Sequence, residues 1–217
     1  MSKKTKIETL RPKTGKNQPQ QLAQEDYQVI TERILKISRK RKSILFAGTG
    51  SGTLPITIPV NVAIQLAEKG KHCLLIDLDL RRDGLARVFE ISNEQINQSL
   101  MPKAIKTHFP NLLIWPGRHF IRTRLMNIVE VVDAACKSMD IILINAPSFL
   151  TSLDRGQILA AGQACCIFSG NNTEAEEMLR LVKDSQCALI GNIRIALSSE
   201  HYSDNSNIPV DFPKTTA

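Results

Sequence analysis

The stretch Ser43–Asp83 reads SILFAGTGSGTLPITIPVNVAIQLAEKGKHCLLIDLDLRRD and decides the fold. A short apolar strand, Ile44–Ala47, runs into a Gly-punctuated loop, Gly48–Thr53, and an apolar helix follows. A second apolar strand, Cys73–Ile76, then ends in a pair of aspartates. This order of strand, Gly-rich loop, helix, strand and paired acids predicts a phosphate-binding βαβ unit.

The whole chain has the composition of one α/β domain with flexible ends. It has 217 residues, of which 42% are apolar and 23% are charged, and a domain of this size can bury roughly 70% of its unfolded surface. Nearly continuous apolar strands alternate with helices, a pattern typical of a parallel sheet covered on both faces. We therefore predict a doubly wound, mostly parallel sheet with helices on both faces, as in P-loop NTPases. This domain would cover residues 20–197, between a basic flexible tail (1–19) and a polar disordered tail (198–217).

The remaining elements are predicted from the same periodicities. Gln20–Lys40 has the spacing of an amphipathic helix, and Thr57 is expected to cap the helix after the loop, with Pro59 in its first turn. Thr173 with Glu176 forms a capping-box pattern. The other predicted elements are helix Asp83–Glu90, connector Ile91–Pro110, strand Asn111–Pro116, helix Thr123–Ser138, strand Asp140–Ile144, helix Ser152–Ala161, strand Ala164–Ser169, helix Thr173–Ser185 and strand Ala188–Ile193.

The sequence Asp77-Leu78-Asp79-Leu80-Arg81-Arg82, after three apolar residues, resembles the second Walker motif of a known kinase family. This family is the bacterial tyrosine kinases that accompany polysaccharide co-polymerases, which belong to the MinD/ParA-type P-loop ATPases. The resemblance covers residues 22–197. In the family, the P-loop lysine lies six residues before an Asn-apolar-Ala sequence, here Asn61-Val62-Ala63, and twenty-two before the first acid. Both spacings place the lysine position at Pro55.

The residues that carry the family's chemistry are replaced at the matching positions. A P-loop binds phosphate through backbone N–H groups, a lysine, and a Ser/Thr hydroxyl on Mg²⁺. Pro55 has neither an ammonium nor an N–H group, the hydroxyl position is Ile56, and the acid of the third Walker motif is Asn145. The second lysine of MinD-like loops falls on Gly50, and the Asn that contacts adenine falls on Ile195.

The site implied by the resemblance is therefore vestigial. Asp77, Asp79 and Asn145 hold the vestigial catalytic positions. The vestigial P-loop consists of Gly48, Gly50, Ser51, Gly52, Thr53, Pro55, Ile56 and Thr57. We expect no cofactor, ATP with Mg²⁺ only if the degenerate site still binds it, and no metal, with Asp77 the one candidate ligand.

The positive charge of the chain is concentrated in its first 42 residues. They contain twelve Lys and Arg against four Asp and Glu, whereas the remainder contains sixteen against seventeen. The tail and the run Arg39, Lys40, Arg41 and Lys42 could attract an anionic partner, such as lipid headgroups, an acidic protein or nucleic acid. Equally, they could be a solvated tail and a helix end whose dipole favours cations. Nucleic acid is the least favoured partner, because only 5% of residues are aromatic and could stack on bases.

The predicted first helix resembles the helix that joins subunits of the tyrosine kinases into rings through a Glu-x-x-Arg-x-x-Arg pattern. Glu25 matches the acid, but the arginine positions are Gln28 and Thr31. The kinases also end in a cluster of tyrosines that they phosphorylate, and here the tail has only Tyr202. The resemblance thus predicts neither a ring held by these ion pairs nor a tyrosine-rich substrate tail.

The cellular compartment is predicted from absences in the sequence. The five cysteines form no CxxC pair, which is typical of reduced cysteines in a cytosolic protein. No apolar run approaches ~18 residues, and the N-terminus has no signal-like apolar core. We expect a cytoplasmic protein, with peripheral association at the inner face of the plasma membrane as a further option.

Three functional hypotheses are compatible with the sequence. The first is a non-catalytic relative of the tyrosine kinases in exopolysaccharide or capsule production. It would bind an active kinase paralogue or the membrane co-polymerase. The second is a weak ATPase or kinase that uses Gly48–Thr53, Asp77 and Asp79. The third is a degenerate MinD/ParA-type positioning factor that binds membrane or nucleoid through its basic N-terminus.

Overall fold

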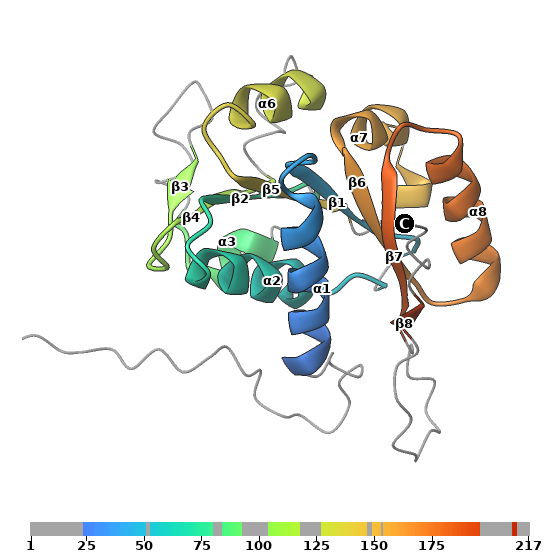
Figure 1. Cartoon of the computed structure of the whole chain (residues 1–217), viewed down its shortest axis with the longest axis horizontal. Helices are drawn as coiled ribbons and strands as arrows, with labels where there is room; N and C mark the ends of the chain where they lie inside the picture. The colour runs from blue at the N-terminus through green and yellow to red at the C-terminus, as the bar shows by residue number, and fades with distance from the viewer. Residues whose placement is uncertain are drawn as a thin grey trace, which may run out of the picture.

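The computed structural model describes residues 24–50, 53–79, 84–92, 104–117, 127–146, 149–152, 154–195 and 210–211. Within them, eight strands form one sheet in the order β3-β4-β2-β5-β1-β6-β7-β8 (Figure 1). The strands are β1 Ser43–Gly48, β2 Cys73–Asp77, β3 Ile105–Lys106, β4 Leu112–Trp115, β5 Ile141–Ala146, β6 Ala164–Ser169, β7 Ala188–Arg194 and β8 Val210–Asp211. The helices are α1 Gln24–Ile37, α2 Thr57–Glu68, α3 Gly84–Val88, α6 Ile128–Ala135, α7 Arg155–Ala161 and α8 Asn172–Lys183, with a 3-10 turn at Phe149–Thr151.

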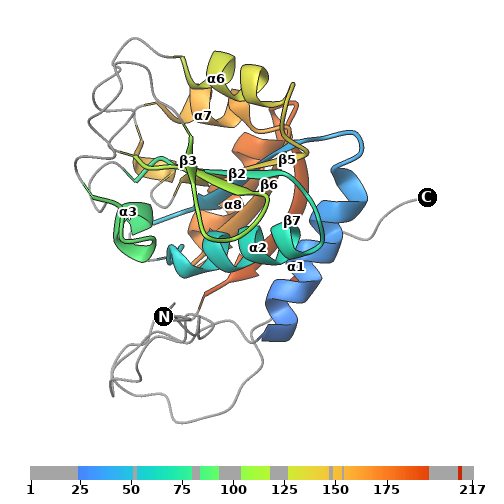
Figure 2. The same ribbon diagram turned by 90° about the vertical axis from the view of Figure 1, so that its left-hand side faces the viewer.

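The six central strands are parallel, and the two-residue outer strands β3 and β8 pair antiparallel with β4 and β7. The predicted doubly wound, mostly parallel fold is confirmed. Helices α1, α2 and α3 cover one face of the sheet, and α6, α7 and α8 cover the other (Figure 2). Because all six parallel strands run the same way, the loops that follow them meet at one edge of the sheet.

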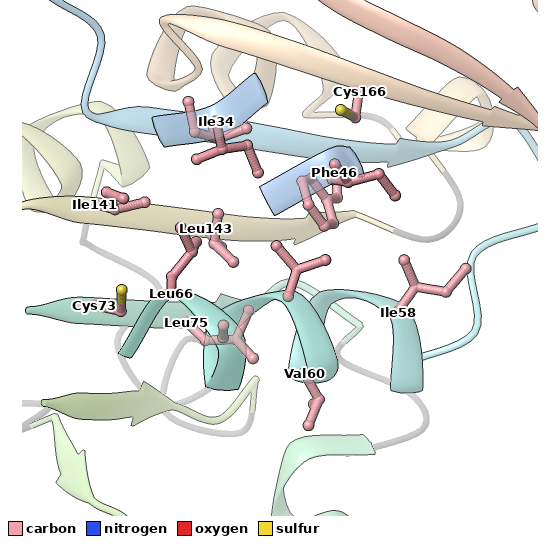
Figure 3. Packing of buried hydrophobic residues seen from close by; sticks show 14 of the residues in the cluster. Ile34, Phe46, Ile58, Val60, Leu66, Cys73, Leu75, Ile141, Leu143 and Cys166 are labelled. Atoms are coloured by element: carbon pink, nitrogen blue, oxygen red, sulfur yellow. The ribbon is translucent and has the colours of Figure 1, made fainter. Parts of the chain in front are cut away.

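Two apolar cores form because successive strand residues point to opposite faces. In β1, Ile44 and Phe46 join the core under α1 and α2, whereas Leu45 and Ala47 join the core under α7 and α8. All six residues of β1 are buried. Figure 3 shows the first core, in which Ile34 of α1 lies over the strands that carry Phe46 and Leu143.

Helix α1 is fastened to α2 by polar as well as apolar contacts. The Thr31 hydroxyl is fully buried and donates to Gln65 Oε1 at 2.8 Å. The Tyr27 hydroxyl makes side-chain hydrogen bonds with Thr57 and Asn61 at the start of α2, while burial raises the pKa of this phenol. Thr31, one of the two arginine positions of the ring-forming pattern, is therefore used inside the subunit.

Most predicted elements are confirmed within a few residues, and the exceptions are short strands and helix caps. Residues 105–106, predicted as part of a connector, form β3, and residues 210–211 form β8, so the predicted disorder of the tail is wrong at those two residues. Asn171 caps α8 by accepting from Glu174 N at 2.9 Å, so the predicted cap at Thr173 is wrong. Edge strands of two residues carry too little periodicity to be recognised from sequence.

The described residues contain no helix long and apolar enough to cross a membrane. The segments 1–23 and 198–209, and Tyr202 within them, lie outside the described residues.

Gly162 provides a test of how closely α7 packs on the central strand. Its φ of −88° and ψ of 116° suit any residue, but a Cβ there would lie 2.9 Å from Leu45 Cβ. Gly162→Ala should therefore lower the free energy of unfolding by roughly 1–3 kcal/mol through overpacking. Gly156→Ala, in α7 with no atom within 4 Å of its added Cβ, should raise it by up to about 1 kcal/mol. Urea titration of both variants checks this, and equal stability of the two would contradict the packing.

Candidate functional site: a degenerate phosphate loop

The structure brings the predicted site residues together at the edge where the parallel strands end. The loop follows β1, and β5 lies between β1 and β2 in the sheet. Asp77, the last residue of β2, lies directly opposite Asn145 of β5. Gly48, Asp77 and Asn145 therefore occupy three neighbouring strand ends, as the resemblance implies, whereas Ser51 and Gly52 lie outside the described residues.

Three described backbone donors in the first half of the loop are occupied by acceptors within the protein. The N–H of Thr49 donates to Phe168 O at 2.9 Å, and that of Gly50 donates to Thr53 Oγ1 at 3.1 Å. The N–H of Thr53 donates to Gly50 O at 3.3 Å. A phosphate-binding loop requires N–H groups that point together at the ligand. At these three residues the N–H groups instead donate to acceptors in the loop itself or in β6.

A carboxylate lies against the same loop. Glu174, in the first turn of α8, accepts a hydrogen bond from the Thr49 hydroxyl at 2.7 Å. Its Oε1 atom lies 3.4 Å from where a Cβ on Gly50 would be. Gly50 holds the position of the second lysine of MinD-like loops, so this part of the loop faces a carboxylate where the family has an ammonium. Like charges disfavour a phosphate here.

The second half of the loop is apolar and packed. In the pattern G-x-x-x-x-G-K-[ST], a lysine position at Pro55 places the glycines at Thr49 and Leu54. Leu54 is buried in the core beside α2, and Ile56 packs on α3, since a Cβ on Gly84 would lie 3.0 Å from Ile56 Cγ1. All four positions of the pattern are thus replaced. The Leu54 replacement is visible in the spacing but was not used in the sequence prediction.

The helix after the loop begins at Thr57, and Pro59 lies in its first turn as predicted. The predicted N-cap at Thr57 is wrong. Ile56 takes the cap position with helical φ and ψ, and no side chain caps the helix there. Thr57 instead contacts the Tyr27 hydroxyl. Since Pro59 lacks an N–H group, the start of α2 offers fewer donors than an ordinary helix N-terminus.

Asp77 is fully buried, and protein donors take both of its oxygens. Oδ1 accepts from Asp79 N at 2.9 Å and from Asn145 Nδ2 at 2.8 Å, and Oδ2 accepts from Leu85 N at 3.4 Å. Burial is the largest influence and raises the pKa of Asp77 to about 6, although the three hydrogen bonds lower it. The side chain therefore acts as a junction between β2, β5 and α3. Asp79, two residues on, is half-buried.

The backbone of Asp77 and Asp79 is also enclosed by the loop after β4. A Cβ on Gly117 would lie 3.1 Å from the carbonyl oxygens of both aspartates. Only a residue without a side chain lets this loop approach so closely. No sequence pattern predicts that Gly117 lies beside these residues.

These residues do not fit a bound Mg²⁺–nucleotide. The metal in such sites is held by a Ser/Thr hydroxyl and an acid, but here Ile56 is apolar and the Asn145 amide donates to Asp77. Asn145 Oδ1 is the one oxygen left over, because it is buried and accepts no hydrogen bond from the described residues. No group of three potential metal ligands occurs in the described ranges. Ile195, at the adenine position, is buried with 1% of its surface exposed.

The predicted interaction residues divide into two pairs. Arg41 Nη1 donates to Gln163 O at 2.9 Å, and Lys42 Nζ donates to the carbonyls of Cys136 and Met139 at 2.8 and 3.0 Å. These two side chains fasten the turn before β1 to its neighbours and are half-buried, whereas Arg39 and Lys40 are exposed. The side chain of Glu25 lies outside the described residues.

Two of the cavities among the described residues are lined by no residue of the loop. One, of about 390 Å³, lies at the opposite edge of the sheet between Arg41, Gln163 and Cys187. The other, of about 240 Å³, lies between α6 and β4 and is lined by Trp115 and Val131 among others.

Comparison with known proteins decides the family. Residues 42–168, more than half of the chain, match the family described as ATPase MipZ. The chain belongs to the MipZ ATPase family. This match begins just before β1 and ends in β6, so it includes the degenerate loop and the ends of β2 and β5.

Relatives of this MipZ-family chain include tyrosine kinases and MinD proteins. The tyrosine-protein kinase YwqD of Bacillus subtilis (strain 168) is 26% identical over 178 residues, which cover 74% of each chain. The kinase domain of the Escherichia coli tyrosine kinase ETK has 17% identity and a TM-score of 0.62, covering 84% of this chain and 80% of that one. The septum site-determining protein MinD of Pyrococcus horikoshii OT3, solved with Mg-ADP, has 22% identity and a TM-score of 0.60, covering 70% and 68%. The predicted relation to MinD/ParA-type proteins and bacterial tyrosine kinases is confirmed.

The raised pKa of Asp77 gives a pH-dependent prediction. A carboxyl whose folded pKa is about 6 instead of 3.8 contributes most to stability below its unfolded pKa, and this contribution is lost as pH rises through 6. Asp77→Asn removes the titration. Relative to the unmodified protein, this variant should therefore gain roughly 2–3 kcal/mol of unfolding free energy between about pH 4 and pH 8.

Chemical denaturation at a series of pH values measures the difference. Asp133→Asn, which removes an exposed carboxylate on α6, controls for the loss of one charge. If the unfolding free energies of Asp77→Asn and of the unmodified protein changed with pH in parallel, the description of Asp77 as a buried carboxyl with a raised pKa would be wrong.

Proposed function

We propose that this protein is a non-catalytic relative of bacterial tyrosine kinases that acts by binding a partner in exopolysaccharide or capsule biosynthesis and export. The partner would be an active kinase paralogue or the cytosolic part of the membrane co-polymerase. The similarity to tyrosine kinases supports a role in this pathway, because those kinases accompany polysaccharide co-polymerases. The protein would work in the cytoplasm, with peripheral association at the inner face of the plasma membrane.

The observation that carries the non-catalytic part is the set of hydrogen bonds at the strand ends. The N–H groups of Thr49, Gly50 and Thr53 are taken by protein acceptors, and both oxygens of Asp77 are taken by protein donors. Catalysis of phosphoryl transfer depends on a lysine and Mg²⁺ that clamp the transferring group. The residues at those positions, Pro55 and Ile56, can supply neither an ammonium nor a metal-binding oxygen.

Two alternatives remain as competing proposals. A weak ATPase or kinase would have to use Asp77 and Asp79 after α3 moved away from Asp77, since Leu85 N now donates to that carboxylate. A degenerate positioning factor is favoured by the match to the MipZ family and by the fold of MinD. Identifying the proteins that the full chain captures distinguishes these roles. Capture of a kinase or co-polymerase would support the first proposal, whereas capture of a septum or chromosome factor would support the positioning role.

We predict that Mg-ATP neither stabilises the protein nor is hydrolysed by it. A ligand stabilises a protein by RT ln(1 + [L]/Kd), about 2.7 kcal/mol at one hundred times Kd. A site with Kd of about 10 μM would thus give a clear rise in melting temperature in millimolar nucleotide. We expect no rise and no phosphate release. Mg²⁺-dependent phosphate release that Asp77→Ala abolishes would refute the proposal and favour the enzyme.

The reverse substitutions test the alignment of the lost positions. Pro55→Lys, Ile56→Ser and Asn145→Asp restore the lysine, the hydroxyl and the acid, and Glu174→Gln removes the carboxylate that faces the loop. A melting-temperature rise in Mg-ATP that appears only in this variant would support the assigned positions. A rise in the unmodified protein would instead make it a nucleotide sensor.

A further inference from the structure

Three neighbouring connections at the edge where the parallel strands begin are rich in exposed cations. They precede β2, β5 and β1, which are adjacent in the sheet. Lys69 and Lys71 come before β2, Lys137 before β5, and Arg39, Lys40, Arg41 and Lys42 before β1. Arg39, Lys40, Lys69 and Lys137 are exposed. Against these seven cations stand Asp140, on the same connections, and Glu68 and Asp133, in the last turns of α2 and α6.

Hydrogen bonds hold the three connections against one another. Lys42 Nζ joins the turn before β1 to the end of α6, where it donates to the carbonyls of Cys136 and Met139. His72 N donates to Asp140 Oδ2 at 2.9 Å, which joins the segment before β2 to that before β5. Three adjacent strands span about 10 Å, close to the Debye length at physiological ionic strength. The cations therefore act on a partner as one charged surface.

The opposite edge, where the strands end, has exposed cations, among them Arg87, Arg155 and Arg194, as well as acids. Asp79 and Glu174 lie half-exposed beside the loop, and Asp154, Glu176 and Glu177 are exposed at the starts of α7 and α8. In the described residues, positive charge thus predominates where the strands begin (the basic edge), whereas both signs of charge occur where they end.

The basic edge lies at the opposite end of α1 from the residue that the tail precedes. Helix α1 has 14 residues and is about 21 Å long. Its last turn leads into Arg39–Lys42 at the basic edge, whereas Tyr27 in its first turn contacts the start of α2 beside the loop. Residue 24, from which residues 1–23 extend, therefore belongs to the opposite end of the domain. The sequence groups Arg39 and Lys40 with the tail as one basic N-terminus, whereas the fold places them near Lys69 and Lys137.

We propose that the basic edge formed by Arg39, Lys40, Lys69, Lys71 and Lys137 docks the protein on an anionic membrane surface. These five cations come from three connections spread along an edge, and none of the five lines the cavity there. This arrangement complements a broad, flat anion such as a layer of lipid headgroups better than a single acidic peptide. Each basic residue at such a surface strengthens binding about fivefold. Docking by this edge turns the edge with the loop away from the membrane and towards the cell interior.

The test is co-sedimentation of the full chain with phosphatidylcholine vesicles with and without phosphatidylglycerol. The edge variant is Lys69→Glu with Lys137→Glu. The matched control is Arg155→Glu with Arg194→Glu, which makes the same change in net charge with exposed side chains near the edge where the strands end. Melting temperatures of both variants confirm folding. We expect binding only to the anionic vesicles, and a loss of about twentyfold or more in the edge variant but not in the control.

Other outcomes would overturn the proposal in distinguishable ways. Equal binding by the edge and control variants would assign membrane binding to the tail, which replacement of the lysines and arginines of residues 1–19 by glutamine would then abolish. Failure of the unmodified protein to bind anionic vesicles would exclude the membrane as partner. Edge-dependent binding to polyglutamate in that case would indicate an acidic protein. None of these results depends on nucleotide, so they leave the non-catalytic proposal to its own experiment.

Discussion

The buried hydrogen bond from the Asn145 amide to the Asp77 carboxylate joins the ends of two central strands, and several segments depend on it. The same carboxylate accepts the N–H of Leu85 at the start of α3, and Gly117 packs on the backbone beside it. A buried carboxylate is costly unless it is hydrogen-bonded or paired. In a metal-binding relative, a cation would balance the acids at these strand ends, whereas here an amide and two backbone N–H groups do so. The site is built as a structural junction.

The loop after β1 has been converted in the same manner. In a phosphate-binding loop, backbone donors are left free until the ligand arrives, and the structure bears the cost of leaving them unpaired. Here Thr53 turns back to pair with Gly50, and Glu174 takes the hydroxyl of Thr49. Leu54 and Ile56 then extend the apolar core to the edge of the sheet. Each change replaces an interaction with a ligand by one within the chain.

The sequence predicts the sheet and the identity of the degenerate positions well, because both rest on local signals. Apolar runs define the central strands, and fixed spacings from Asn61 and Asp77 locate Pro55. It does not predict Glu174 beside Thr49, a contact between residues 125 positions apart. Nor does it predict that Arg41 and Lys42 turn inward while Lys69 and Lys137 join Arg39 and Lys40. Those arrangements follow from the strand order, which a single sequence specifies only through the packing of the whole chain.

The internal hydrogen bonds of the loop also bear on how such a protein could be regulated. A nucleotide can switch a protein between two conformations only if it binds one of them more tightly than the other. If the pairing of the Thr49, Gly50 and Thr53 N–H groups and the enclosure of Asp77 prevent nucleotide binding, as we propose, no such difference arises. The domain would then exist in one state, where its nucleotide-driven relatives alternate between two. Its association with other molecules would then depend on its concentration and location in the cell. No cycle of nucleotide binding and hydrolysis would control when the association occurs.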